Sequence, residues 1–560
     1  MNFILPVLSA IARRAKANFA TKTRQMDAVQ ERFLLKLLRS HQDTELGRKF
    51  KLSEVKTIDA FRERVPILPY SSYAPYTERI AKGEPNVLNP DSVIYINLTS
   101  GSTGNQKKVP VTQRFHKSLI SANLASIGFA FDALAARSTS ERKLEFGKML
   151  VTNSTLIQGK TEGGIEYGPV TVGSLRRGKL LYQYVLANSY DTLAIADSVS
   201  RHYVCLLFAL GDGGVRSLVA NFPMLVLRTC GYLEKYAPDL INDLKTGAIA
   251  PWVQIKPELR AKLERQLRPN PQRARELTEI LQSEGRLTPI LAWPKLSFVT
   301  TAFGGTSDFY FERFPDYFND TPRFGGIFGT AEGHFGIYHD FDNEGSILAI
   351  DSGFFEFIPE EEWEAEQPKT IMPGEVKVGK RYRILVTSYS GFYRYDIGDV
   401  VEVLGFYEQT PIIVFRHRRG GLLSSTTEKT TEFHVTQAMR ALCEEFKVEL
   451  EDFCIALSAQ EFPARYLVNV ELAGDRSLDD PQAFLQRFDY WLAEYNNPYG
   501  TVRRSEVPPP RLQILAPGSF AIVRRRQVEK GMSDSQLKFP HISEDRNLLS
   551  GLTVVEEIDF

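Results

Sequence analysis

The sequence is poor in the features that mark secreted, metal-binding or nucleic-acid-binding proteins. It has 4 cysteines among 560 residues, and no two of them form a C-x-x-C pair, so neither a disulfide framework nor a cysteine zinc site is indicated. Its 68 basic and 68 acidic side chains cancel, and no net field favours nucleic acid or an anionic membrane. Free thiols suit a reducing compartment, and we expect a cytoplasmic protein.

Long uncharged hydrophobic runs are also missing. The stretch from Met1 to Ala12 is apolar, but the basic residues follow it instead of preceding it, which is the wrong order for a secretion signal. It is also too short to span a membrane. We expect an amphipathic helix packed on the body of the protein, and we expect no later segment to approach the length and apolar character of a membrane span.

The remaining composition is that of an ordinary globular protein. Hydrophobic residues make up 43% and charged residues 24%, which is enough for a large core and more than one domain. Apolar patterns of helical and strand type alternate, which predicts an α/β fold whose ligands gather at strand ends. Helices are expected at 27–49, 114–137, 257–284 and 481–495, and strands at 93–98, 148–152, 202–210, 296–303 and 466–472.

The most informative stretch is the glycine- and hydroxyl-rich segment from Thr99 to Lys108, which ends in two lysines. Glycines let the backbone approach a ligand, hydroxyls and amides donate hydrogen bonds, and lysine adds charge, as a polyphosphate requires. The spacing is not that of a P-loop. The Val-Pro-Val-Thr segment that follows reads as a strand, so we expect the loop to join two strands. Lys107 and Lys108 fit the loop lysine equally well, and an ordinary turn is the alternative.

Two further stretches add carboxylates. Glu332 lies between glycines in the segment 323–337, where it could hold Mg²⁺ beside a polyphosphate or merely cap a turn. Phe328 offers a flat face for a purine. Asp399 follows a glycine turn and precedes an alternating strand, and a fixed carboxylate there could accept the hydroxyls of a ribose. Taken alone, such a Gly-Asp pair is usually a turn.

These stretches, in this order, resemble the motifs of the adenylate-forming superfamily, and more closely those of the plant auxin-responsive (Gretchen Hagen) family of acyl-acid amido synthetases. Segments 99–108, 328–332 and 393–400 are similar to its three motifs, with Asp396 in place of a basic residue. Residues 415–429 resemble its hinge. Gln536-Leu537-Lys538-Phe539-Pro540 resembles the segment that carries its mobile lysine, followed here by His541 instead of arginine.

The resemblance implies a large N-terminal adenylation domain, 1–424, with β-sheets flanked by helices, and a smaller mobile α/β domain, 425–560. It implies ATP and Mg²⁺ as cofactors, and a small carboxylic acid and an amino acid as substrates. The sequence does not encode the oligomeric state in a readable pattern, and a monomer is our expectation. The acid would attack the α-phosphate of ATP, and the amine would then displace AMP from the acyl-adenylate.

The same resemblance assigns the site residues. Lys538 and Glu332 would be catalytic, with Glu332 holding Mg²⁺ and Lys538 facing the charge at the α-phosphate. Asp399 and Arg418 would lie at the ribose, and Phe328 and its neighbours at the adenine. The residues expected at ATP are Thr99, Ser100, Gly101, Ser102, Thr103, Gly104, Lys107, Lys108, Phe328, Gly329, Thr330, Asp399 and Arg418.

The acid itself is less defined. Segments 150–175 and 300–330 are expected to form its pocket, and their aromatic residues favour an apolar or aromatic acid. The residues expected there are Gly163, Gly164, Tyr167, Phe303 and Gly304. Two other functions stay open: transfer of the acyl group to CoA or a carrier-protein thiol, and binding of nucleotide or acid without turnover.

Overall fold

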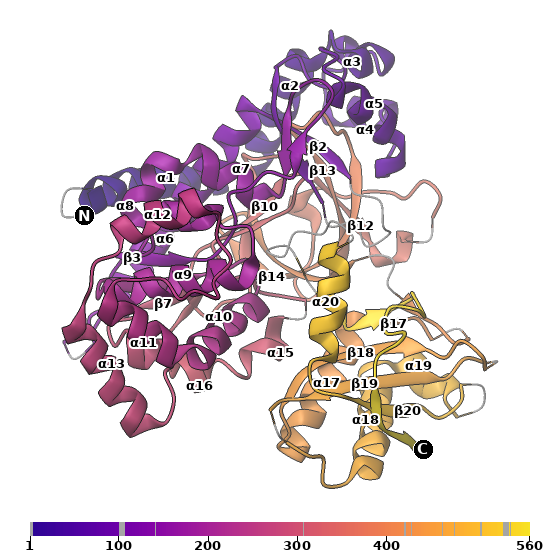
Figure 1. The fold of residues 1–560 in the computed structure, drawn as a ribbon. Coiled ribbons are helices and arrows are strands. Elements are labelled where there is room, and N and C mark those ends of the chain that lie inside the picture. Colours follow the sequence, from indigo (N-terminus) through magenta and orange to yellow (C-terminus); the bar gives the residue numbers. More distant parts are fainter. Residues whose placement is uncertain are drawn as a thin grey trace. The chain divides into compact units, whose positions relative to one another are not determined.

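A computed structural model describes residues 4–99, 107–140, 142–305, 307–363, 365–418, 422–426, 428–461, 463–474, 476–504, 507–529, 537 and 539–560. The chain divides into two compact units (Figure 1). The first unit comprises Met1–Phe303, Tyr310–Ile397 and Val401–Val414. The second unit comprises Gly304–Phe309, Gly398–Val400 and Phe415–Phe560. The mobile domain expected from residue 425 onward stays a prediction.

Three sheets make up the core of the first unit. The prediction of an α/β fold is confirmed. One sheet has the order β2-β1-β5-β4, a second is the parallel sheet β3-β6-β7-β8, and the third has the order β12-β13-β14-β15-β11-β10-β9. Their strands are β1 (Val93–Leu98), β2 (Lys108–Thr112), β3 (Lys148–Val151), β4 (Gly159–Lys160), β5 (Glu166–Gly168), β6 (Val215–Val219), β7 (Phe298–Thr300), β8 (Arg323–Phe324), β9 (Ile327–Gly329), β10 (His334–Tyr338), β11 (Ser346–Leu348), β12 (Phe354–Pro359), β13 (Arg381–Thr387), β14 (Tyr395–Tyr407) and β15 (Thr410–Arg418).

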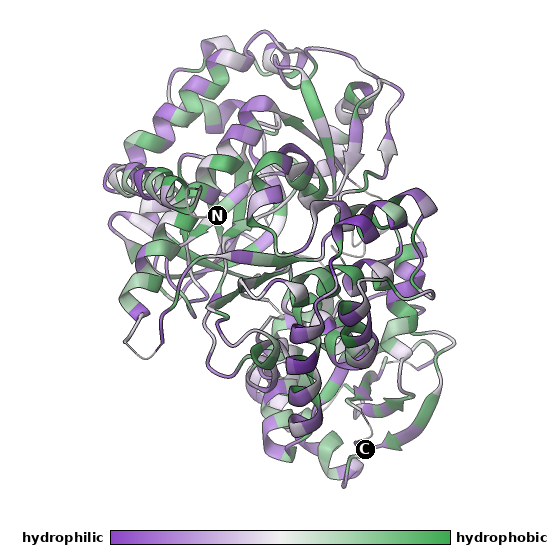
Figure 2. Ribbon diagram, turned by 60° about the vertical axis from the view of Figure 1, so that its left-hand side comes forward, coloured by the Kyte–Doolittle hydropathy of each residue, from purple (hydrophilic) through white to green (hydrophobic). Residues whose placement is uncertain are grey.

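Helices cover these sheets, and Figure 2 shows apolar residues on the strands and polar residues on the outer helix faces. The helices between residues 4 and 318 are α1 (Ile4–Thr23), α2 (Met26–His41), α3 (Glu45–Lys49), α4 (Ile58–Arg64), α5 (Tyr70–Ala81), α6 (Gln113–Arg137), α7 (Val170–Arg177), α8 (Lys179–Val185), α9 (Ser198–Gly211), α10 (Pro223–Lys235), α11 (Ala237–Thr246), α12 (Pro257–Gln266), α13 (Pro271–Glu284), α14 (Pro289–Ala292), α15 (Ser307–Phe311) and α16 (Pro315–Phe318).

Helix α6 carries the predicted 114–137 helix, and α1 packs along it as expected for the N-terminal segment. Gly128 permits this close approach, because a Cβ there would lie 2.3 Å from the carbonyl oxygen of Ala12. The expectation that no later segment resembles a membrane span is wrong for α6, which is long and apolar enough by length and composition. Its apolar residues instead pack against α1 and β10 inside the first unit.

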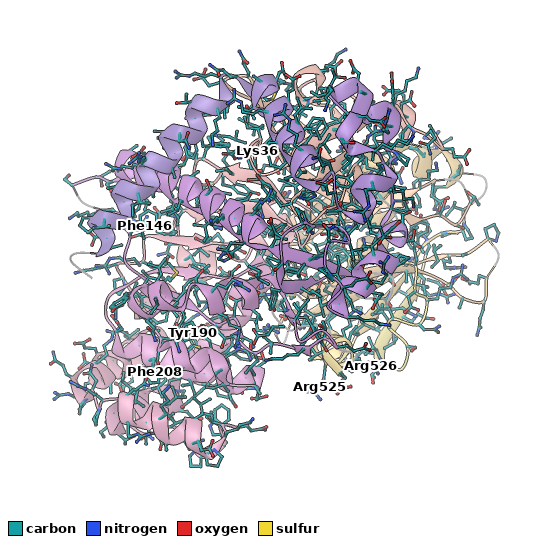
Figure 3. The ribbon with its side chains drawn as sticks, turned by 90° about the horizontal axis from the view of Figure 1, so that it is seen from above. Lys36, Phe146, Tyr190, Phe208, Arg525 and Arg526 are labelled. Atoms are coloured by element: carbon teal, nitrogen blue, oxygen red, sulfur yellow. The ribbon has the colours of Figure 1, made fainter. Side chains whose placement is uncertain are left out.

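The strand predicted at 202–210 is wrong, because these residues belong to helix α9. The side chain of Asp197 caps its first turn by accepting a hydrogen bond from the amide of Ser200 at 2.8 Å. The helix is apolar on nearly all sides and lies among α10, α11 and β3; Figure 3 labels Phe208 on it. A continuous apolar run does not distinguish a buried helix from a buried strand.

Two predicted helices are interrupted. The segment 27–49 forms α2 and α3, which are separated where Thr44 caps the second helix. The segment 257–284 forms α12 and α13, because Pro269 and Pro271 cannot continue the first helix and Pro271 suits the start of the second.

The second unit contains the sheet β21-β18-β19-β20-β22 with helices beside it. The strand expected at 466–472 and the helix expected at 481–495 are confirmed as β19 and α18. Its elements are β16 (Leu422–Leu423), β17 (Thr430–Thr431), α17 (Glu432–Phe446), β18 (Leu450–Leu457), β19 (Tyr466–Leu472), α18 (Pro481–Tyr495), α19 (Asn497–Val502), β20 (Arg511–Leu515), α20 (Ser519–Glu529), β21 (Ile542–Ser543) and β22 (Val554–Asp559).

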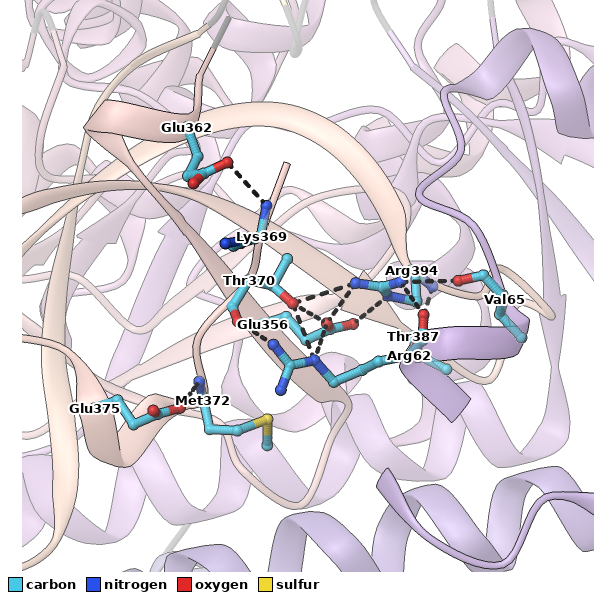
Figure 4. Close-up of polar contacts among 10 residues, drawn as sticks. All are labelled: Arg62, Val65, Glu356, Glu362, Lys369, Thr370, Met372, Glu375, Thr387 and Arg394. Carbon is cyan, nitrogen blue, oxygen red and sulfur yellow. Dashed lines mark hydrogen bonds and ion pairs between the residues drawn. The ribbon is translucent and has the colours of Figure 1, made fainter. Parts of the chain in front are cut away.

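A buried ion pair fixes the turn between β13 and β14 (Figure 4). Nε and Nη2 of Arg394 each donate to the carboxylate of Glu356 at 2.9 Å. Nη1 of Arg394 donates to the carbonyl oxygens of Arg62 and Val65, at 2.8 and 2.9 Å. Arg394 has a φ of 44°, a left-handed conformation unfavourable for arginine, so these contacts hold a strained residue in place.

Removing Arg394 takes away the bidentate partner of the buried Glu356 carboxylate, which keeps only a longer ion pair with Arg62 at 3.5 Å and a hydrogen bond from Thr370. We therefore expect Arg394→Met to lower the free energy of unfolding of the protein by about 3–5 kcal/mol. Urea denaturation followed by tryptophan fluorescence measures the change. The control is Arg24→Met, which removes an exposed pair with Glu408 at 3.2 Å and is expected to cost only about 0–1 kcal/mol. Equal effects of the two substitutions would contradict a structural role for the buried pair.

Candidate active site

The predicted phosphate loop joins two antiparallel strands, as expected. β1 pairs with β2 so that Asn97 faces Val109 and Leu98 faces Lys108. The amide of Thr99 then donates to the carbonyl oxygen of Lys107 at 3.2 Å, which closes the base of the loop. The predicted residues Ser100, Gly101, Ser102, Thr103 and Gly104 lie outside the described residues.

The two lysines at the end of the loop point to different surroundings. Nζ of Lys107 donates to the hydroxyl of Tyr395 at 3.1 Å. Nζ of Lys108 instead forms a partly exposed ion pair with Glu78 at 2.6 Å. Lys107 immediately precedes β2, and Lys108 is its first residue. Lys107 therefore shares a hydrogen-bond partner, the hydroxyl of Tyr395, with the carboxylate of Glu332.

Tyr70, which the sequence reasoning did not select, holds this end of the loop. Its hydroxyl accepts from the amide of Lys108 at 2.6 Å and donates to the carbonyl oxygen of the same residue at 3.2 Å. The ammonium of Lys107 lies over the rings of Tyr70 and Tyr395, at 5.7 and 5.8 Å from their centroids. Both are cation–π distances. Burial raises the pKa of Tyr70, which keeps its hydroxyl protonated.

Glu332 lies in the turn between β9 and β10. The amide of Thr330 donates to the carbonyl oxygen of Gly333 at 2.9 Å, and the amide of Glu332 donates to Oγ1 of Thr330 at 3.1 Å. Ser388 and Asn97 donate to the carbonyl oxygens of Glu332 and Ala331, at 2.9 and 3.1 Å. The turn is thus held by its own hydrogen bonds, by β1 and by the residue that follows β13, and Glu332 is only 3% exposed.

The buried carboxylate of Glu332 accepts a hydrogen bond from the hydroxyl of Tyr395 at 3.2 Å. Among the described residues, no group of three or more histidine, cysteine, aspartate or glutamate side chains could hold a metal ion. A single carboxylate still fits Mg²⁺, which commonly binds one or two carboxylates and completes its shell with waters and substrate phosphates. The donor set therefore fits a phosphate-bound Mg²⁺ rather than a metal held by protein alone.

The neighbours of this turn include Phe328 and His334. Phe328 is half-buried and packs on Phe335 with the ring centroids 5.4 Å apart. His334 packs edge-on against Phe115 at 4.9 Å. Burial lowers the pKa of His334 to about 4, so it is neutral at pH 7. Its Nε2 atom is buried without a hydrogen-bond partner in the described part of the chain.

Asp399 and Arg418, which were predicted separately for one ribose site, are brought together in the second unit. Nε of Arg418 donates to Oδ1 of Asp399 at 2.6 Å. The aspartate side chain is 3% exposed and the arginine side chain 41% exposed, so the pair has one buried and one accessible member. Asp396, which stands where the family motif often has a basic residue, forms an ion pair with Arg383 at 3.1 Å.

Lys538 lies outside the described residues, but its neighbours are anchored in the second unit. Leu537 and Phe539 are buried, and Phe539 packs edge-on against Phe520 at 4.8 Å. His541, which replaces the expected arginine, is fully buried; its Nε2 atom lies 3.3 Å from Oδ1 of Asp452, and its ring stacks on Phe453. The histidine therefore fixes the backbone instead of facing a ligand.

The residues expected in the acid pocket lie on two chain segments beside different sheets, and their role stays a prediction. Gly163 and Gly164 make the turn between β4 and β5, and Gly163 is explained by packing because a Cβ there would lie 2.4 Å from the amide nitrogen of Gly83. Tyr167 belongs to that same sheet. Phe303 and Gly304 instead follow β7 in the parallel sheet, where Phe303 packs against Phe311 and Tyr338.

Models of three domains of one family match most of the chain. The GH3 family N-terminal domain matches residues 15–323, the central domain residues 346–418 and the C-terminal domain residues 433–547. Among curated proteins, a jasmonoyl–L-amino acid synthetase of Nicotiana attenuata is 26% identical, with 95% of this chain and 93% of that protein covered. The indole-3-acetic acid-amido synthetase GH3.15 of Arabidopsis thaliana is also 26% identical, with 92% and 90% covered.

Solved structures agree on the fold. The AtGH3.15 acyl acid amido synthetase in complex with 2,4-DB superposes with a TM-score of 0.86 at 23% identity, covering 98% of this chain and 97% of that one. A 2-hydroxyisobutyryl-CoA ligase in the postadenylation state has a TM-score of 0.51 at 11% identity, with 93% and 90% covered. The family models, which together span most of its length, establish that this chain belongs to the GH3 family.

Proposed function

We propose that the protein is an ATP-dependent acyl-acid amido synthetase that joins a carboxylic acid to an amino acid. The observation that carries this proposal is the meeting of Lys107 and Glu332 at the base of the glycine-rich hairpin, linked by the hydroxyl of Tyr395. A cation and a carboxylate beside a loop of this composition suit a nucleoside triphosphate and its Mg²⁺. Membership of the GH3 family supports the same reaction.

The reaction proceeds in two displacements. A carboxylate oxygen of the acid forms a bond to the α-phosphorus of ATP, the bond to the bridging oxygen breaks, and pyrophosphate leaves. The amine nitrogen then attacks the acyl carbon, AMP leaves with the oxygen that joined it to the acid, and the amine loses a proton. Neither step requires a covalent enzyme intermediate, so the protein contributes position and charge.

Different described residues bind the phosphates, the metal ion and the base. Lys107 binds a phosphate, and Lys108 keeps its ion pair with Glu78. Glu332 holds Mg²⁺, which neutralises phosphate charge when it is bound. The turn of Phe328, Gly329 and Thr330 lies beside Glu332 and is proposed to contact the nucleotide base.

In the second unit, the carboxylate of Asp399 accepts hydrogen bonds from the hydroxyls of the ribose. The half-exposed guanidinium of Arg418 orients that carboxylate through their hydrogen bond. Lys538 supplies the charge that faces the α-phosphate, on a segment anchored by its two buried neighbours, Leu537 and Phe539. A lysine on a separate unit allows one arrangement for adenylation and another for amide formation. We propose that the protein works as a cytoplasmic monomer.

We expect carboxylate-dependent exchange between ATP and pyrophosphate in the presence of Mg²⁺. The relatives are named for jasmonic and indole-3-acetic acid, so the panel should contain cyclic, aryl and indolyl acids together with fatty acids. Each active acid is then incubated with pooled amino acids, and amides are identified by mass. Exchange without an amide, but with AMP release on addition of a thiol such as CoA, would contradict the amine acceptor.

The two lysines of the hairpin provide a matched pair. Lys107→Ala removes the cation beside Glu332, and we expect kcat/KM for ATP to fall about 100-fold, as for loss of one electrostatic contact in the transition state. Lys108→Ala removes only an exposed ion pair, and we expect less than about a threefold change. Initial rates of pyrophosphate exchange measure both variants. The opposite ranking would reassign the phosphate contact to Lys108.

Lys538→Ala tests the assignment that rests on the sequence motif. We expect it to abolish acyl-adenylate formation almost completely while ATP binding, followed by calorimetry, persists. This split is expected because the lysine stabilises charge that develops during the reaction more than charge already present in the ground state. Nearly normal pyrophosphate exchange in this variant would refute the assignment, and loss of ATP binding would give the lysine a binding role instead.

A further inference from the structure

Tyr395 stands between the two charged groups of the proposed phosphate site. Its hydroxyl oxygen lies 3.1 Å from Nζ of Lys107 and 3.2 Å from Oε1 of Glu332. An ammonium can only donate hydrogen bonds, and an ionised carboxylate can only accept them. The direction of the chain is therefore fixed: Lys107 donates to the hydroxyl oxygen, and the hydroxyl proton is donated to Glu332.

This order of donors and acceptors lets the hydroxyl of Tyr395 transmit the charge of Lys107 to Glu332. A cation that donates to a hydroxyl polarises it and makes it a stronger donor to the next acceptor. Glu332 is 3% exposed, and a buried carboxylate requires such donors. The hydroxyl thus supports the negative charge of Glu332 and the position of Lys107 at the same time.

The ring of Tyr395 is held rigidly. It is completely buried and packs against Phe392 and Tyr73, with centroids 5.1 and 5.9 Å apart. On either side of it, the carbonyl oxygen of Arg394 accepts from the amide of Leu68 at 3.2 Å, and the amide of Asp396 donates to the carbonyl oxygen of Leu68 at 3.1 Å. Its orientation is consequently set by the packing of the ring and by the backbone bridge to Leu68.

We propose that Tyr395 is a positioning residue that couples the phosphate-binding Lys107 to the metal-binding Glu332. The inference rests on the proposed function, because it assigns a role within the same site. It goes beyond that function by predicting that the two subsites are energetically linked through one hydroxyl. Removing the hydroxyl should weaken Mg²⁺ and ATP together while leaving the acid unaffected.

The variant Tyr395→Phe keeps the ring and deletes only the hydroxyl. We expect the dissociation constant of MgATP and the half-saturating Mg²⁺ concentration each to rise about tenfold, the effect of losing a hydrogen bond to a charged group. The KM of the carboxylic acid should change less than about twofold, as expected for an interaction confined to the nucleotide site. Calorimetry measures MgATP binding, and pyrophosphate exchange measures the Mg²⁺ and acid dependences.

Tyr73→Phe is the matched control. Tyr73 belongs to the same aromatic cluster and is also completely buried, but its hydroxyl bonds only backbone groups of Tyr393, donating to the carbonyl oxygen and accepting from the amide. A general loss of packing or stability would therefore affect both variants. We expect Tyr73→Phe to bind MgATP as the unaltered protein does, and an equal loss in both variants would overturn the proposal.

A double-mutant cycle separates coupling from independent contributions. If Tyr395 acts through Lys107, Tyr395→Phe should weaken MgATP binding less than about threefold in the Lys107→Ala background, because coupled sites are not additive. A full tenfold loss in that background would overturn the proposed coupling.

Failure of the proposed function has a different signature. Binding of MgATP by the unaltered protein without exchange for any acid would contradict the synthetase while the calorimetric cycle still decides the role of Tyr395. Absence of MgATP binding in the unaltered protein would overturn both proposals.

Discussion

The bidentate pair between Arg394 and Glu356 is the interaction on which the rest of the site depends. It ties β12 to the turn before β14 and, through the carbonyl oxygens of Arg62 and Val65, to the C-terminal end of α4. The residues on either side of Arg394 are Tyr393 and Tyr395, both completely buried. A charged, strained residue in the core therefore holds the tyrosine that contacts Lys107 and Glu332.

From this fixed point the site extends along three chain segments that are far apart in sequence. The β1–β2 hairpin contributes Lys107, the β9–β10 turn contributes Glu332, and the start of β14 contributes Tyr395. Each arrives on a strand or a tight turn, so the charged groups are placed by rigid backbone. Preorganised charge of this kind is what phosphoryl-type transfer demands, since water or flexible side chains would have to reorganise during the reaction.

Much of this arrangement could be predicted from the sequence, and the failures have physical reasons. The proline-containing strand after the 99–108 loop indicated that this loop joins two strands. The glycines around Glu332 indicated that another group can approach its carboxylate closely. The choice between Lys107 and Lys108 could not be made from the sequence, because it depends on which side chain reaches Tyr395, a residue far along the chain. The 202–210 helix was mistaken for a strand because burial on all sides hides its period.

The acid pocket was the least predictable part, since glycines such as Gly163 satisfy local packing as well as they admit a ligand. Local pattern identifies groups that carry charge or permit a turn, but not the partners that tertiary structure brings to them. Tyr70 illustrates this limit, because its two hydrogen bonds to the backbone of Lys108 join segments 38 residues apart.

The central claim is that the acid is activated as an acyl-adenylate, and isotope transfer tests it most directly. A carboxylic acid labelled with ¹⁸O in its carboxylate is converted to the amide, and the phosphorus-containing products are examined by mass spectrometry. The account predicts one ¹⁸O atom in AMP, because the oxygen that attacks the α-phosphorus leaves with it. Label in orthophosphate, or AMP without label, would contradict activation at the α-phosphate.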